Sequence, residues 1–147
     1  MINAKGLEVI KRYEGCSLNV YRDPIGIWTI GYGSIFGLDL NRVDRSHRAI
    51  TEDEATSLLF RECQEAERAI ARLVRVQLTS NQVSALISLV FNVGSGNFQR
   101  STMRMKLNRR DYIGAANEFW KWRRAGGRIL KGLVRRRASE EQLFKES

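Results

Sequence analysis

The chain has 147 residues, of which 43% are hydrophobic and 28% charged, and this balance excludes a disordered or low-complexity protein. A chain of this length suits a single domain, with room for two lobes around a cleft, and can bury a core without disulfides. No apolar run near the N-terminus is long enough for a signal peptide or a membrane span. We therefore expect synthesis in a cytoplasm, and help from another protein if the substrate lies outside.

The net charge of +9 is concentrated in the segment that begins at Arg100 and ends at Arg137. This segment has thirteen Lys and Arg against two acids, Asp111 and Glu118, which gives +11. The rest of the chain has twelve basic and fourteen acidic residues, which gives −2. Such a distribution favours a polyanionic partner and leaves three classes open: nucleic acid, an anionic membrane and an acidic cell wall.

The cysteines and the histidine suggest neither a metal site nor a disulfide framework. Cys16 and Cys63 are the two cysteines, no CxxC occurs, and His47 is the one histidine. We expect two reduced thiols, with a regulatory disulfide as the alternative. His47 falls in a charged loop at residues 38–50, and we assign it no role.

The first candidate functional residue is a carboxylate at the end of the first predicted helix. Asn3 is a suitable N-cap, and Gly15 is a typical residue to end that helix, so Glu14 falls on its last turn. The negative end of the helix dipole disfavours the charged form of Glu14, as a general acid requires. The alternative is a solvated glutamate at a helix end.

The second candidate is a carboxylate at the bend of a predicted β-hairpin. Residues 18–22 and 27–33 have strand character, and Asp23-Pro24-Ile25-Gly26 is a turn sequence between them. We expect Asp23 to be exposed and ionised. An ionised Asp facing a protonated Glu is the usual arrangement in glycosidases, although Asp-Pro in a turn is more often only structural.

The remainder of the chain is predicted to be helical. A capping box at Thr51 starts a helix over residues 51–74, which can join two lobes. A second capping box, at Thr79, starts a buried helix that ends in a flexible connector at residues 92–96. Asp111 should cap a helix that continues to about residue 123. Gly126-Gly127 then breaks the chain before a last helix. Trp28, Trp120 and Trp122 can stack on sugars, but core packing is the commoner role of tryptophan.

The order of these motifs resembles the phage-type lysozymes, glycoside hydrolase family 24, over nearly the whole chain. The central motif is Glu14-Gly15, then Asp23, Gly26 and Thr29-Ile30-Gly31-Tyr32-Gly33. Further agreement comes from Phe91-Asn92-Val93-Gly94, Asn97-Phe98, Ser101-Thr102, Gly126-Gly127 and Gly132-Leu133-Val134-Arg135-Arg136-Arg137. The separate motifs are weak signals, whereas their spacing and order are specific.

The resemblance implies an α+β, predominantly helical, two-lobed lysozyme fold in a single domain over residues 1–147. Its small β-hairpin lobe would span residues 16–50, and a long helix would join it to a helical lobe of residues 51–147 completed by the N-terminal helix 3–14. The implied activity is hydrolysis of the β-1,4 bond between N-acetylmuramic acid and N-acetylglucosamine in peptidoglycan. Such an enzyme needs no metal or cofactor and would act as a monomer during host lysis.

By position, the resemblance makes Glu14 the general acid, Asp23 the opposing carboxylate, and Thr29 the residue that helps to hold the attacking water. An inverting enzyme of this kind needs its two carboxyl groups about 6.5–9.5 Å apart. The resemblance also suggests that the saccharide groove is lined by Gly33, Ile35, Phe91 and Thr102.

One position departs from the family pattern and one carries an open question. Ser34 stands where many members have histidine, so we expect no charged bridge there and no effect on catalysis. The arginine run at residues 135–137 resembles a segment that places an arginine beneath the active-site glutamate. That arginine would lower the pKa of Glu14 and oppose the effect of the helix dipole.

Two alternatives remain at this stage. A lytic transglycosylase would use one catalytic acid on the same substrate, and the Asp23 and Thr29 spacing argues against it. A basic module active on membranes or lipopolysaccharide would use residues 100–137 instead. No helix-turn-helix, zinc or aromatic RNA-binding pattern supports a nucleic-acid partner.

Overall fold

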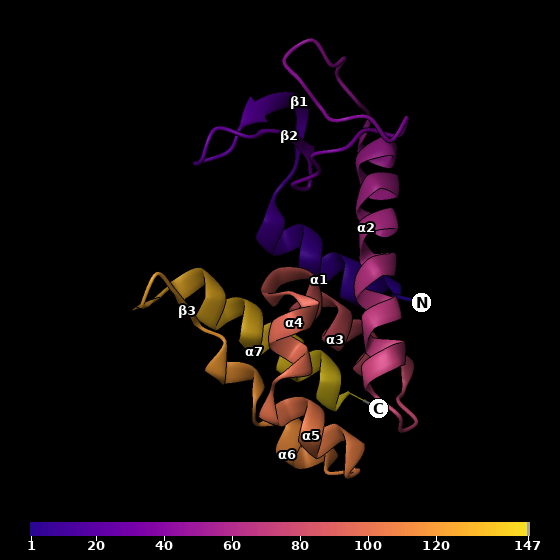
Figure 1. Cartoon of the computed structure of the whole chain (residues 1–147), viewed down its shortest axis with the longest axis vertical. Coiled ribbons are helices and arrows are strands. Elements are labelled where there is room, and N and C mark those ends of the chain that lie inside the picture. Colours follow the sequence, from indigo (N-terminus) through magenta and orange to yellow (C-terminus); the bar gives the residue numbers. More distant parts are fainter. Residues whose placement is uncertain (147) are drawn as a thin grey trace. The chain divides into compact units, whose positions relative to one another are not determined.

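The computed structural model describes residues 1–146. It is predominantly helical with two small antiparallel sheets, which confirms the predicted α+β class (Figure 1). The chain forms two compact units, one of residues 11–62 and one that combines residues 1–10 with the chain from residue 63 onward. Helices α1 and α2 contribute residues to both units.

Helix α1 (Ala4–Glu14) begins and ends where the sequence predicts. The Oδ1 atom of Asn3 accepts a hydrogen bond from the backbone N–H of Gly6 at 2.9 Å, which caps the first turn. At the other end Gly15 takes the left-handed conformation, with φ at 69°, and its N–H donates to the carbonyl of Lys11. Glu14 is therefore fixed as the last helical residue.

Strands β1 (Ser17–Arg22) and β2 (Trp28–Gly31) form the predicted hairpin. Their antiparallel ladder pairs Tyr21 with Thr29, and the register is irregular between Ser17 and Tyr21. After β2 the chain does not continue as a strand to residue 33. Gly31 and Gly33 have φ of 67° and 96° and reverse its direction, so that the residues on either side form a short bridge.

The loop after the hairpin is tied to helix α2 (Glu52–Leu73). Arg61 of this helix donates to the carbonyl oxygens of Gly37 and Phe36 at 2.8 and 3.1 Å. The predicted capping box is present, because Thr51 and Glu54 exchange hydrogen bonds between side chain and backbone, both at 3.1 Å. The buried hydrophobic side chains of this unit come from the hairpin, the loop and α2: Ile30, Tyr32, Val43, Ile50, Ala55, Leu58 and Leu59.

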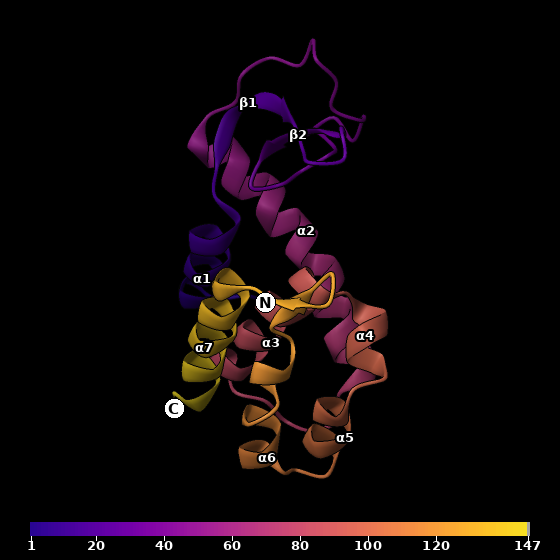
Figure 2. The same cartoon turned by 90° about the vertical axis from the view of Figure 1, so that its left-hand side faces the viewer.

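The helical unit is organised around α3 (Ser80–Val93) and α7 (Lys131–Lys145), which pack side by side (Figures 1 and 2). The predicted capping box between Thr79 and Gln82 is present at the start of α3. All seven residues 84–90 of this helix are buried, which confirms its predicted central position. The rings of Phe119 and Phe144 meet edge to face at 5.6 Å.

Two sequence predictions in this unit are wrong. The connector expected to be flexible at residues 92–96 is helical except at Gly94. Its first two residues end α3 and its last two begin α4 (Ser95–Gln99), which fully buried Phe98 fixes in the core. After α5 (Thr102–Asn108), the helix capped by Asp111 is only α6 (Tyr112–Ala116), and a 3-10 turn, η1 (Phe119–Lys121), follows it. This break lets buried Glu118 contact Lys106 and Lys121 at 3.4 and 2.5 Å.

The Gly126-Gly127 pair is the tip of a second hairpin. Its strands are β3 (Arg124–Ala125) and β4 (Arg128–Ile129), and both glycines have positive φ, 59° and 77°. Two-residue hairpin loops require this conformation, which glycine adopts without steric cost.

Part of the arginine run is buried in an ionic network on α7. The Glu140 carboxylate is fully buried and lies 2.7 Å from Arg137 Nε and 3.3 Å from Arg136 Nε. The Ser88 hydroxyl of α3 donates to Glu140 Oε2 at 2.6 Å, and Arg136 donates to the Ser88 carbonyl at 3.1 Å. These bonds pair the charges in the interior and fix α7 against α3.

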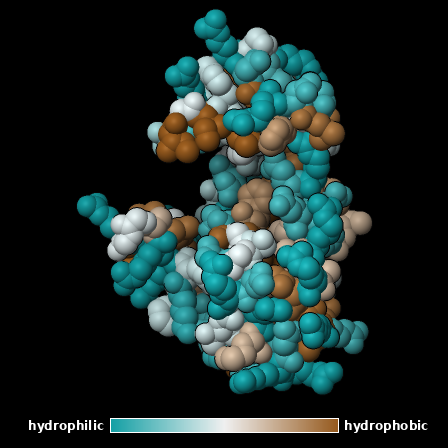
Figure 3. Space-filling view, viewed as in Figure 1, coloured by the Kyte–Doolittle hydropathy of each residue, from teal (hydrophilic) through white to brown (hydrophobic). Residues whose placement is uncertain are grey.

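The outer surface is largely hydrophilic in the view of Figure 3. Within residues 1–146, none of the helices has the length and apolar character that crossing a bilayer requires.

Candidate active site

The unit of residues 11–62 contains both predicted catalytic carboxylates. Glu14 is half-buried at the end of α1. A methyl group built on Gly33 would lie 3.8 Å from Glu14 Oε2, so the bare backbone of Gly33 flanks this carboxylate. Because glycine has no side chain, Gly33 leaves space beside the Glu14 carboxylate that a substrate could occupy.

Asp23 is held in a fixed orientation by the hairpin turn. Its Oδ1 accepts hydrogen bonds from the N–H groups of Ile25 and Ile27 at 3.0 and 2.8 Å. The residue is half-buried, whereas the sequence predicted an exposed side chain. Within residues 1–146, Oδ2 has no hydrogen-bond partner. One carboxylate oxygen thus stabilises the turn, and the other remains able to accept a proton or bind water.

Thr29 lies on β2 and is 4% exposed. Its hydroxyl donates to the carbonyl of Ile27 at 2.9 Å. Because that bond uses the hydroxyl proton, Oγ1 can act toward a bound water only as an acceptor.

Tyr21 is a member of this group that the sequence did not suggest. It lies opposite Thr29 in the β1–β2 ladder. Burial raises the pKa of Tyr21, and the negative charges of Glu14 and then Asp23 raise it further. The phenol is therefore a neutral hydrogen-bond donor within the field of both carboxylates. Counting the hairpin register outward from the turn would have placed Tyr21 beside Thr29.

Glu62 on α2 is a second ionisable residue that the sequence did not suggest. Burial raises its pKa, and the charge of Glu14 adds to the increase, while Ser34 and Arg61 act in the opposite direction. Ser34 is fully buried and uncharged. Glu62 thus extends the acidic group around Glu14, and only its position on the buried side of α2 could have indicated it.

The predicted substrate-binding residues divide between the two units. Ile35 is half-buried, and its carbonyl accepts from Val43 N–H at 2.8 Å. Phe91 is half-buried on α3, and Thr102 is exposed at the start of α5, where it lines a cavity of about 340 Å³. Both belong to the helical unit. Their contact with a saccharide stays a prediction.

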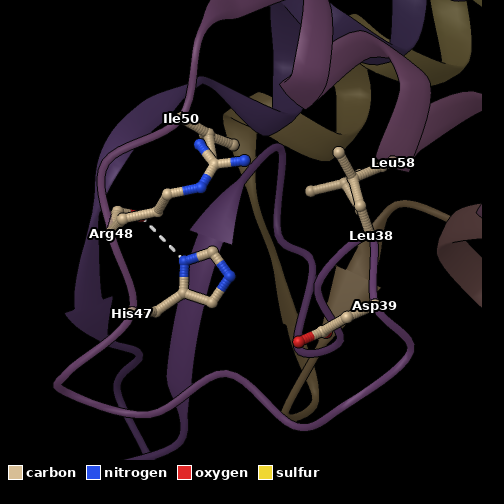
Figure 4. A pocket seen from close by; sticks show the side chains of 6 residues that line it. All are labelled: Leu38, Asp39, His47, Arg48, Ile50 and Leu58. Carbon is tan, nitrogen blue, oxygen red and sulfur yellow. Dashed lines mark hydrogen bonds between the residues drawn. The ribbon is translucent and has the colours of Figure 1, made fainter.

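A second cavity of about 220 Å³ lies in the unit of residues 11–62 and contains the histidine (Figure 4). Its lining residues are Leu38, Asp39, His47, Arg48, Ile50 and Leu58. His47 Nδ1 lies 2.8 Å from the Arg48 carbonyl, which requires the proton on that nitrogen. The Arg48 side chain is paired with Glu54 at 2.6 Å. These polar contacts stay within the loop and the first turn of α2, and they give His47 a structural role.

Within residues 1–146, the cysteines and the acidic side chains form no further candidate functional site. Cys16 is exposed, Cys63 is buried, and neither forms a disulfide. No three His, Cys, Asp or Glu side chains of residues 1–146 are grouped closely enough to hold a metal ion.

The chain is similar to known proteins over its full length. The endolysin of Acyrthosiphon pisum secondary endosymbiont phage 1 is 41% identical over 150 residues, which cover 99% of both chains. A crystal structure of a P22 lysozyme variant matches with a TM-score of 0.92 and 40% identity, over 99% of each chain. The muramidase domain of SpmX from Asticaccaulis excentricus matches with a TM-score of 0.86 and 32% identity, over 100% of this chain and 99% of that one.

The model of the phage lysozyme family matches residues 11–140, a range that includes both carboxylates, the hairpin and the arginine run. Together with the relative of 41% identity and the shared fold, this match shows that the chain belongs to the phage lysozyme family.

Proposed function

We propose that this protein is an endolysin that hydrolyses the β-1,4 bond between N-acetylmuramic acid and N-acetylglucosamine in bacterial peptidoglycan. Family membership supports cell-wall hydrolysis, and similarity to a protein described as a muramidase domain supports this bond. In this proposal residues 1–147 work as one lysozyme domain, without a cofactor. The enzyme is made in the host cytoplasm and reaches the wall with the help of another protein.

The observation that carries the proposal is the arrangement of Glu14 and Asp23. Glu14 lies beside an unsubstituted glycine backbone, and Asp23 has one oxygen fixed by the turn and the other available. A glycosidase needs this division of labour, in which one carboxyl gives a proton and another receives one.

The proposed reaction begins with transfer of a proton from Glu14 to the glycosidic oxygen as the bond to the anomeric carbon breaks. A water attacks that carbon from the opposite face, and Asp23 Oδ2 accepts its proton. Thr29 Oγ1 accepts a hydrogen bond from this water because its own proton is bound to the Ile27 carbonyl. Space for the water requires the carboxyl groups to be about 6.5–9.5 Å apart in the complex with substrate, and the product then has inverted configuration.

Digestion of purified peptidoglycan, with mass spectrometry of the products, tests the proposal. We expect reducing muramic-acid ends from the wild type and a rate loss of at least about 10²-fold in Glu14→Gln. Glu8→Gln is the matched control, because Glu8 is exposed on the same helix and the change removes the same charge.

The other outcomes lead to different conclusions. Anhydro-muramic ends that disappear in Glu14→Gln would replace hydrolysis by transglycosylation. Equal rates for Glu14→Gln and the wild type would remove Glu14 from the reaction. Intact glycan after treatment with the wild type would contradict the enzymatic function itself.

A further inference from the structure

The second hairpin and the residues beside it form an unusually cationic surface, which we name the cationic hairpin and define as residues 120–134. These residues include five basic side chains and no acidic one. Both strands, Arg124–Ala125 and Arg128–Ile129, are exposed along their whole length.

Most of the cations in the cationic hairpin are available to a partner. Arg124, Arg128 and Lys131 are exposed, and none has a carboxylate within salt-bridge distance in the described chain. Arg123 is stacked on the ring of Trp120, 4.9 Å from its centroid, and leaves its charge uncompensated. Among these cations, only Lys121 is neutralised within residues 1–146, by Glu118 at 2.5 Å.

Large hydrophobic side chains are exposed among these cations. Trp120 is 50% exposed, Ile129 47%, Leu130 43% and Val134 41%. Backbone hydrogen bonds of 3.0 Å join the segments on either side of the hairpin, because Leu130 N–H donates to the Arg123 carbonyl and Val134 N–H donates to the Leu130 carbonyl. In Figure 3 hydrophobic and hydrophilic surface alternate at the end of the helical unit labelled β3 in Figure 1. Cations and apolar groups thus share one continuous surface.

Some other cations of residues 100–137 are used inside the protein. Arg104 on α5 donates to the carbonyls of Leu73 and Gln99, and Arg100 donates to Asn97, so these guanidinium groups serve internal contacts. A soluble polyanion would be bound by cations alone and gives no reason for four exposed apolar side chains. A lipid surface needs both, since its phosphates attract cations and its interface accepts tryptophan and aliphatic side chains.

We propose that the cationic hairpin binds an anionic lipid surface. Arg124, Arg128 and Lys131 contact the lipid phosphates, and Trp120, Ile129 and Leu130 enter the interfacial layer. This activity is separate from the proposed hydrolysis and needs neither Glu14 nor a glycan. It would hold the enzyme at a membrane next to the wall.

Sedimentation with lipid vesicles tests the proposal with the whole protein. We expect the wild type and Glu14→Gln to bind phosphatidylglycerol vesicles equally, and phosphatidylcholine vesicles far more weakly. The triple variant Arg124→Gln, Arg128→Gln, Lys131→Gln should lose affinity for phosphatidylglycerol by on the order of 10²-fold, about fivefold for each cation. The matched control is Arg72→Gln, Arg75→Gln, Arg109→Gln, which removes three exposed charges elsewhere and should lose much less.

A second variant separates a lipid surface from a soluble polyanion. Ile129→Ser with Leu130→Ser should weaken vesicle binding by at least about tenfold and leave binding to soluble polyphosphate unchanged. Both side chains are exposed, and neither belongs to the buried core. Circular dichroism confirms that each variant is folded.

Three results would overturn the proposal. The first is equal loss in the two triple variants, which would mean that only net charge acts. The second is unchanged vesicle binding in the serine variant, which would make the surface a simple polyanion site. The third is absence of vesicle binding by the wild type at low salt.

Discussion

Tyr21 and Thr29 lie opposite each other across the β1–β2 ladder, with Asp23 at the turn that joins their strands. The Tyr21 phenol is in the field of both Glu14 and Asp23, which together with burial raises its pKa. The hairpin register therefore places a neutral donor beside the residue that we propose as the water ligand.

Tyr21→Phe removes that donor and keeps the ring. We expect kcat on peptidoglycan to fall by about tenfold, the size of one hydrogen bond to a charged group, with little change in thermal stability. Turbidity assays with the wild type and the variant measure this difference. An unchanged kcat would mean that the phenol contributes only packing.

Gly33→Ala and Gly26→Ala form a matched pair of substitutions. Both glycines have positive φ, 96° and 89°, so each alanine should destabilise the protein by about 1–2 kcal/mol. Only at Gly33 would the new methyl group lie near Glu14 Oε2, whereas nothing lies within 4 Å of the position at Gly26. We expect similar melting temperatures and a loss of kcat/KM confined to Gly33→Ala. Equal activity losses would show that strain alone is responsible.

Asp23→Asn distinguishes the roles of the two oxygens of this carboxylate. The amide oxygen can still accept from Ile25 and Ile27, so the turn and the stability should be retained. The amide cannot accept a proton from water, and activity should fall by at least about 10²-fold. Asp23→Ala, which loses the turn bonds as well, should also lower the melting temperature. Substantial activity in a folded Asp23→Asn variant would remove the general-base role.

Glu62→Gln should change the pH dependence of stability. Because the folded pKa of Glu62 lies above the ordinary value of 4.5, the unfolded chain loses this proton first as the pH rises. The contribution of Glu62 to the free energy of unfolding is thus fully present below pH 4.5 and is lost as the pH rises through the folded pKa. Gln resembles the protonated form, so the variant should match the wild type at pH 4 and be more stable at pH 7. Urea denaturation at the two pH values measures this, and a pH-independent difference would contradict it.

The sequence predicts those parts of the fold that local chemistry determines. Asn3, Thr51 and Thr79 each accept a backbone hydrogen bond in the first turn of the helix that they were expected to cap. The Asp23–Gly26 turn likewise forms from its own residues. The predictions fail where tertiary packing decides, as at α4, where burial of Phe98 orders a glycine-containing segment expected to be flexible.

The same distinction applies to the candidate site. Glu14 and Asp23 are adjacent to recognisable helix and turn signals, so the sequence locates them. Tyr21 and Glu62 have no such signal, because their environment depends on strand register and on the burial of one side of α2. The catalytic and binding roles stay predictions that the substitutions above test.

The Glu140 network also reduces the number of cations in residues 100–137 that can bind a polyanion. Arg136 and Arg137 count among the thirteen cations of residues 100–137, yet they are 3% and 1% exposed. Their counterions are supplied inside the protein by Glu140, so no salt ion is released from them when a polyanion binds. The salt dependence of any such binding should therefore follow the surface cations of this segment and be shallower than its composition suggests.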